Sequence, residues 1–107
     1  MQALLLKKLT NLTIDGRIKW IKKNTSIGVD KYCTETQYFA YEIRVESRSY
    51  VDFTLTNKLS GERFNRSAFA SEIILELIDM INESISVDVT QPASIRIVAL
   101  RELRSLS

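Results

Sequence analysis

Three carboxylates, Glu42, Glu46 and Asp52, come nearest to catalytic chemistry in this 107-residue chain. They occupy even-numbered positions in two runs where polar and apolar residues alternate, so a hairpin would place them on one face. Two carboxylates can divide the roles of acid and base when burial or mutual proximity separates their pKa values. On an open sheet face we expect neither condition, and we predict a solvated surface on which Arg44 faces Asp52.

The sequence lacks most other catalytic groups. It has no histidine and a single cysteine, Cys33, so a histidine base, a Cys-His pair, the common zinc ligand sets and an intrachain disulfide are all excluded. The glycines at positions 16, 28 and 61 are too scattered for a loop that cradles phosphate. We therefore predict a protein that is not an enzyme and that uses no metal or cofactor.

A basic segment is the first candidate binding site. Its members are Arg17, Lys19, Lys22 and Lys23. Positive charge of this kind can contact phosphates, which would suit a nucleic-acid binder, and Trp20 in the same segment is a candidate platform for base stacking. The alternation instead groups Trp20 with Ile18, which favours packing of Trp20 in the core.

An acidic stripe is the second candidate site. Four carboxylates at spacings of four, three and four residues would lie along the outside of one helix: Glu72, Glu76, Asp79 and Glu83. The stripe is complementary in charge to the basic segment, so one copy of the chain could contact another copy or a charged partner. Tyr38 and Tyr50 are further candidates by parity, although cross-strand packing on an exposed face is the favoured explanation for them.

Local signals predict the elements that position these residues. Leucines at helical spacing predict a helix over 3–13, ended by Asp15-Gly16, and the alternation over 17–20 predicts a strand. Residues 24–30 have no period and are expected to form a loop. The hairpin over 37–56 is the clearest element, with Val45 facing Val51 and a turn at 47–49. A short strand should follow Gly61, over 62–65.

Two helices are expected after the sheet. Ser67 is positioned to cap the first helix, whose broad apolar side comprises Phe69, Ile73, Ile74, Leu77, Ile78, Met80 and Ile81. The tail over 92–105 is ambiguous, because Ile95 to Leu100 alone would also suit an edge strand. We assign a helix that starts near Pro92 and has the apolar positions Ile95, Val98, Ala99, Leu103 and Leu106.

Together these elements predict a single α+β domain over 1–107. The architecture that buries all the apolar stripes is an antiparallel sheet of three to four strands, with the N-terminal helix and two C-terminal helices packed on one face. The apolar run at Met1 to Leu6 is too short for a membrane span or secretory signal, and Lys7 and Lys8 follow it rather than precede it. We therefore expect a cytoplasmic location.

The opening residues carry a resemblance. The stretch Leu4-Leu5-Leu6-Lys7-Lys8-Leu9-Thr10, then Thr13 to Gly16 and Ile18-Lys19-Trp20, resembles the start of small uncharacterised bacterial and mobile-element proteins. The resemblance implies a bacterial accessory protein and transfers no activity or site residue. With the surface charges, it leads us to expect a non-catalytic protein-interaction module that self-associates. The alternative is a nucleic-acid binder that uses residues 17–23.

Overall fold

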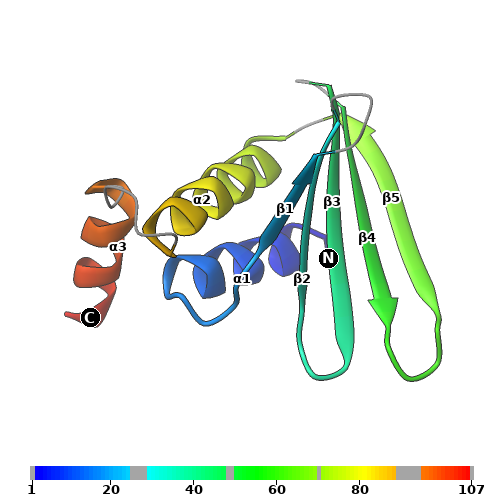
Figure 1. Ribbon diagram of the computed structural model, residues 1–107, viewed down its shortest axis with the longest axis horizontal. Helices are drawn as coiled ribbons and strands as arrows, with labels where there is room; N and C mark the ends of the chain where they lie inside the picture. Colours follow the sequence, from blue (N-terminus) through cyan, green and yellow to red (C-terminus); the bar gives the residue numbers. More distant parts are fainter. Residues whose placement is uncertain (1, 25–28, 48–49, 70, 89–94, 107) are drawn as a thin grey trace. The chain divides into compact units, whose positions relative to one another are not determined.

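The structure of this chain is a computed structural model that describes residues 2–24, 29–47, 50–69, 71–88 and 95–106 (Figure 1). The chain divides into two compact units. A helical unit comprises Met1–Lys19 and Ser71–Ser107, and a sheet unit comprises Trp20–Ala70. The α+β class predicted from the sequence is confirmed. The packing of the helices on one face of the sheet stays a prediction.

The helical unit consists of three helices that contact one another. They are α1 (Gln2–Ile14), α2 (Glu72–Asp88) and α3 (Ile95–Ser105). Leu77 and Ile81, one turn apart on α2, are fully buried with Leu9 of α1. Residues at spacings of three and four lie on one side of a helix, so this apolar side supplies the core of the unit.

Capping motifs are present at the end of α1, where the chain continues to the sheet, and at the start of α2, where it returns from the sheet. At the end of α1, Gly16 has a φ of 71° and donates its N–H to Thr13 O at 3.1 Å, while Arg17 donates to Leu12 O at 2.9 Å. This pair of bonds is a Schellman motif, as the predicted role of Gly16 requires. At the start of α2 the Ile74 N–H is 3.5 Å from Ser71 Oγ, so Ser71 occupies the capping position.

The sheet unit is a five-stranded antiparallel meander in the order β1-β2-β3-β4-β5. Its strands are β1 (Ile21–Asn24), β2 (Asp30–Glu35), β3 (Phe39–Ser47), β4 (Tyr50–Asn57) and β5 (Arg63–Phe69). The predicted hairpin register is confirmed, since Val45 pairs with Val51 and Arg44 with Asp52. The turn predicted at 47–49 falls largely on residues 48–49, outside the described part.

Alternation sorts the two faces of the sheet as expected at the centre of the hairpin. Ile43 and Phe53 are buried on one face, while Arg44 and Asp52 on the other face are half-buried. The exception is Thr54, which is buried on the polar face and accepts a 2.7 Å hydrogen bond from Asn65 Nδ2. A buried hydroxyl requires such a partner, so a strand-to-strand hydrogen bond replaces solvent at this position.

Three sequence predictions about strands are wrong. Residues 17–20 are not a strand, because the chain bends after Gly16 and pairing begins only at Ile21. Strand β2 was missed, although Tyr32 and Thr34 alternate on the face of Ile43. With β2, the sheet has five strands instead of three or four, and β5 runs to Phe69 instead of ending at 65.

Two predictions about helices are also wrong. Ser67 and Phe69 belong to β5, so neither the predicted cap nor the first apolar residue is part of α2. The predicted helical form of α3 is confirmed. Its buried residue within the described part is Ile97, which does not belong to the predicted apolar side. The predicted apolar side of this helix faces solvent instead. Pro92 lies outside the described residues.

Candidate functional site

Helix α3 is anchored to the end of α1 by arginines. Arg101 Nε donates to Ile14 O at 2.6 Å, and Arg104 Nη2 donates to Asp15 Oδ2 at 2.9 Å. The last carbonyls of a helix have no partner within the helix and form the negative end of its dipole. Guanidinium groups are therefore favourable at this position, and Arg101 satisfies the Ile14 carbonyl, which the Schellman motif leaves free.

The electrostatics of this contact favour an ionised Asp15. The hydrogen bond from Arg104 lowers the pKa of the Asp15 carboxyl, against the opposing effect of desolvation. The charges of Arg104, Arg17 and Arg101 lower this pKa further. In return, the hydrogen bond to Asp15 raises the pKa of Arg104. The pair holds a fixed charge at the junction of the two helices.

A second ion pair fastens the start of α3 to α2. Arg96 Nε donates to Glu83 Oε2 at 2.6 Å, and this bond raises the pKa of Arg96. The charges of Asp79 and Glu76 contribute in the same direction. Arg96 therefore sits at the end of the acidic stripe and neutralises its last member. The stripe keeps three exposed carboxylates, Glu72, Glu76 and Asp79.

The opposite side of α3 is apolar and faces solvent. Ile95 is 86%, Leu103 63% and Leu106 76% exposed, and Val98 and Ala99 are also exposed, whereas Ile97 is 0% exposed. We call this surface the α3 outer face, and it consists of Ile95, Val98, Ala99, Leu103 and Leu106. Apolar side chains grouped on one exposed side of a helix are typical of a contact surface.

An open cleft of about 410 Å³ lies beside the α3 anchor, lined by Asp15, Arg101, Arg104 and Ser105. Its cationic groups already have partners, because Arg101 binds the α1 carbonyl and Arg104 binds Asp15. The negative end of the α1 dipole also opposes an anion at this place. The cleft is explained by the anchor and offers no further chemistry.

The basic segment is divided between the two units. Arg17 and Lys19 are exposed at the end of the helical unit, whereas Lys22 and Lys23 lie on β1. Lys22 Nζ is 3.9 Å from Asp30 Oδ2 and 5.7 Å from the centre of the Tyr32 ring. Trp20 is buried as predicted, although residues 17–20 are not the strand from which that prediction was made, so Trp20 provides no exposed ring for stacking.

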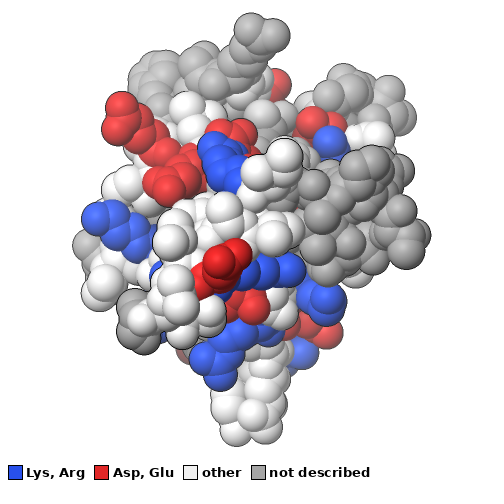
Figure 2. All heavy atoms as spheres, turned by 90° about the vertical axis from the view of Figure 1, so that its left-hand side faces the viewer, with Lys and Arg blue, Asp and Glu red and all other residues white. Residues whose placement is uncertain are grey.

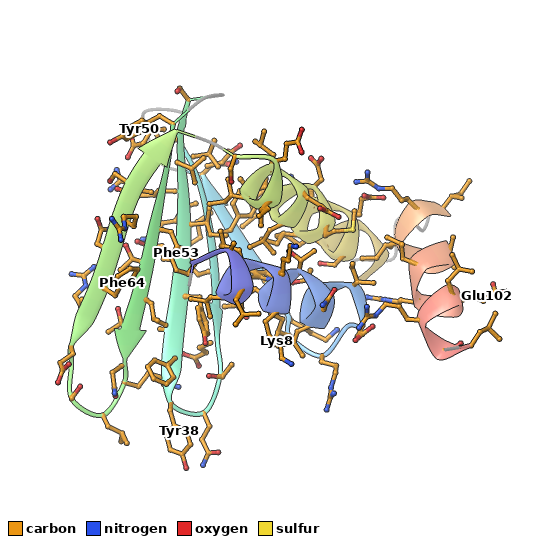
Figure 3. The ribbon with its side chains drawn as sticks, turned by 180° about the vertical axis from the view of Figure 1, so that it is seen from behind. Lys8, Tyr38, Tyr50, Phe53, Phe64 and Glu102 are labelled. Carbon is orange, nitrogen blue, oxygen red and sulfur yellow. The ribbon has the colours of Figure 1, made fainter. Side chains whose placement is uncertain are left out.

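The two candidate tyrosines are exposed but far apart. Tyr38 precedes β3 and its carbonyl accepts from Lys58 N–H, whereas Tyr50 begins β4 opposite Ser47. They therefore lie at opposite ends of the hairpin (Figure 3). One compact partner site cannot use both side chains within a single hairpin.

On the polar face of the sheet, each of the three carboxylates has a different partner. Lys31 Nζ is 2.7 Å from Glu42 Oε1, and this hydrogen bond raises the pKa of Lys31. Asp52 accepts a hydrogen bond from Ser67. Arg44 forms an ion pair with Glu46. Arg44 and Asp52 are therefore opposite each other in the strand register, as expected, but the ion pair that Arg44 makes in the described part is with Glu46.

Comparison with protein-family models, curated proteins and solved structures gives no match for this chain. The resemblance of the opening residues to mobile-element proteins therefore stays a prediction. Within the described ranges, no group of three or more His, Cys, Asp or Glu side chains is arranged to hold a metal ion. The helices of those ranges include none with the length and hydropathy needed to cross a membrane.

Proposed function

We propose that this chain is a non-catalytic protein-interaction module that self-associates through the α3 outer face. The observation that carries the proposal is the orientation of α3, which buries Ile97 and leaves its apolar side in solvent. Burial of apolar surface is the main driving force of most protein association. A terminal helix held by arginines and displaying aliphatic side chains is well suited to this role.

The spacing of the α3 outer face is self-complementary. If a second α3 packs antiparallel about a two-fold axis near residues 100–101, Ile95 lies against the second copy's Leu106 and Val98 against its Leu103. Isologous contacts of this kind are the commonest in homodimers. At the centre the small Ala99 meets the second copy's Glu102, whose carboxylate can reach solvent along its stem.

The expected dimer is weak. A standard interface buries about 800 Å² per partner, and one eleven-residue helix face provides less than that. Mass action then makes the dimer population depend on concentration. A larger interface would include the exposed acids of the stripe, Glu72, Glu76 and Asp79, against a basic surface of the partner.

Sedimentation equilibrium over a concentration series tests the proposal. The apparent mass of the wild type should rise with concentration, while Leu103→Glu should stay monomeric. Leu59→Glu is the matched control, because Leu59 is also highly exposed but lies in the turn after β4. A wild type that stays monomeric at millimolar concentration, or a Leu59→Glu variant that dissociates equally, would refute self-association by α3.

A mixing experiment tests the antiparallel register. Val98→Lys and Leu103→Glu should each be monomeric alone. In the mixed sample, one Lys-Glu pair and one Val-Leu pair would face each other, so association should return. A parallel arrangement would not bring positions 98 and 103 together, and the mixture would then remain monomeric.

Nucleic-acid binding by residues 17–23 is the alternative proposal, supported by the exposed Arg17, Lys19 and Lys23. Against it, Lys22 Nζ already lies 3.9 Å from Asp30 Oδ2. Figure 2 shows basic and acidic side chains among the described residues of one face. Phosphate binding should weaken steeply with salt and should fall when Lys19 and Lys23 are changed to Gln. Absence of binding to DNA or RNA at low salt would eliminate this alternative.

A further inference from the structure

Strand β5 is an open edge of the sheet. Within the described residues its neighbour is β4 alone, and no strand lies beyond it (Figure 1). All side chains from Arg63 to Ser67 are exposed, and Phe64 is 41% exposed along this edge (Figure 3). An edge strand presents backbone groups that can pair with another extended chain.

The hydrogen bonds at the β4–β5 turn identify which backbone groups are available. Asn57 donates to Glu62 O at 2.8 Å, and on the other side of β4 Lys58 donates to Tyr38 O at 2.8 Å. In antiparallel ladders bonded and non-bonded pairs alternate, so both bonds assign the even-numbered residues of β5 to the ladder with β4. Three described residues of β5 therefore direct N–H and C=O away from the sheet: Arg63, Asn65 and Ser67.

The two edges of the sheet differ in their protection. Strand β1 has four residues and carries Lys22 and Lys23, and short lysine-bearing edges resist unwanted pairing. Strand β5 has seven residues and contains neither lysine nor proline. Its length suits addition of a strand, because each pair of outward residues adds further backbone hydrogen bonds.

Charge determines which chain fits this edge. Arg63 and Arg66 are exposed on opposite faces of β5, and in the described part of the molecule neither forms an ion pair. The Arg66 guanidinium lies 5.8 Å from the centre of the Phe64 ring. Pairing β5 with a second copy of itself would bring four arginines onto adjacent strands, where like charges repel. An acidic chain meets no such penalty.

We propose that the β5 edge binds an extended acidic segment of a protein partner, which adds to the sheet as an antiparallel sixth strand. Register defines the preferred pattern of that segment. The residues opposite Arg66 and Arg63 are three positions apart, so both are acidic, and the residue opposite Phe64 is apolar. The motif is acid, any residue, apolar residue, acid, with backbone hydrogen bonds from the three outward positions of β5.

A fluorescently labelled, end-capped peptide of sequence Thr-Thr-Glu-Thr-Val-Glu-Thr-Thr is the probe, and its fluorescence polarisation measures binding to the full chain. The double variant Arg63→Glu/Arg66→Glu should bind at least tenfold more weakly, and a peptide with lysines in place of both glutamates should bind that variant instead. The matched control, Lys22→Glu/Lys23→Glu, reverses the same charge at the other edge and should leave affinity unchanged. Equal losses in the two double variants would overturn the proposal.

A backbone variant separates strand addition from charge attraction. Asn65→Pro removes an outward N–H without removing a backbone hydrogen bond to β4. Asn65→Ala keeps that N–H and, like the proline variant, loses the side-chain bond to Thr54, so it is the matched control. Asn65→Pro should bind the peptide at least tenfold more weakly than Asn65→Ala. Equal affinities would refute strand addition.

Amide hydrogen exchange gives a readout on the wild type, independent of whether the proline variant folds. Saturating peptide should slow exchange at the amides of Arg63, Asn65 and Ser67, and unchanged rates there would also overturn the proposal. The β5 edge and the α3 outer face belong to different units, so Leu103→Glu should bind the peptide as the wild type does. Loss of self-association and loss of peptide binding are therefore distinguishable.

Discussion

Replacing Ile97 by alanine tests how α3 is held. Ile97 is fully buried, and Ile→Ala removes three carbon atoms at about 0.8 kcal/mol each before any cavity is counted. With the cavity, substitutions of this kind cost about 2 to 5 kcal/mol. Ile95→Ala is the matched control, because Ile95 is almost fully exposed two residues away on the same helix.

The free energy lost in Ile97→Ala should make α3 detach locally more often. This helix is terminal among the described elements and is held by Ile97 and three arginine contacts, so it can separate while α1 and α2 stay packed. Once α3 separates, the loss cannot exceed the free energy with which it docks. A loss of about 2 kcal/mol corresponds to an opening equilibrium about 30-fold larger.

Hydrogen exchange followed by mass spectrometry resolves this effect by segment. In Ile97→Ala, peptides covering 95–105 should exchange about 30-fold faster, while those covering 72–85 should change little. The fluorescence of Trp20, a buried residue of the sheet unit, should be unchanged. If Ile95→Ala accelerates exchange as much as Ile97→Ala, the assignment of the buried side of α3 is wrong.

Three further substitutions probe the anchors and turns. Arg104→Gln should lower the melting temperature at pH 7, and this effect should shrink as pH falls below the ordinary pKa of Asp15, because the stabilisation is lost as pH falls through the lowered value. An effect that does not change on acidification would contradict this. Gly61→Ala should lower the free energy of unfolding in urea by roughly 1 kcal/mol, and Gly16→Ala should lower it more. Both glycines have positive φ, but a Cβ at position 16 would also lie 3.1 Å from a nitrogen of Arg101. Equal losses in the two variants would argue against that contact. Ser71→Ala should destabilise α2 by about 1 kcal/mol, measured by thermal unfolding followed with circular dichroism. An unchanged stability would show that the Ser71 hydroxyl does not cap the helix.

The edge and helix surfaces suggest two independent means of association. The α3 outer face is apolar and self-complementary, which suits a second copy of the chain. The β5 edge is cationic and offers backbone groups, which suits an acidic strand. If both proposals hold, a dimer would present two β5 edges, and a partner with two acidic segments would bind with higher avidity than either segment alone.

The helix face illustrates where sequence reasoning failed. The pattern of Ile95, Val98 and Leu103 marks the apolar side of α3, and reasoning from periodicity places that side in the core. Arg101 and Arg104 lie on the other side of the helix, and their contacts with the end of α1 turn that side inward together with Ile97. Periodicity describes one helix alone and contains no information about acceptors on another helix.

The missed strand has a different cause. Strand β2 has a polar composition, with Lys31 and Glu42 paired across to β3, and it lacks the apolar run that makes a strand conspicuous. A tight turn joins it to β3, where Thr36 donates its N–H to Phe39 O at 2.8 Å, but the two residues of that turn, Gln37 and Tyr38, are not typical turn residues. Strands of this kind form because neighbouring strands offer hydrogen-bonding partners, so propensity alone does not identify them.

What the sequence alone determined were features that depend on neighbouring residues: the β3–β4 register, the ends of the turns at Gly16 and Gly61, and the helical form of α2 and α3. Strand parity and positive φ are local properties, so a short segment contains the whole signal. Tertiary structure decided which side of α3 is buried, which carboxylate of the acidic stripe is neutralised, and which strand forms the open edge. Those outcomes depend on contacts between residues distant in the chain, whose energies no single segment encodes.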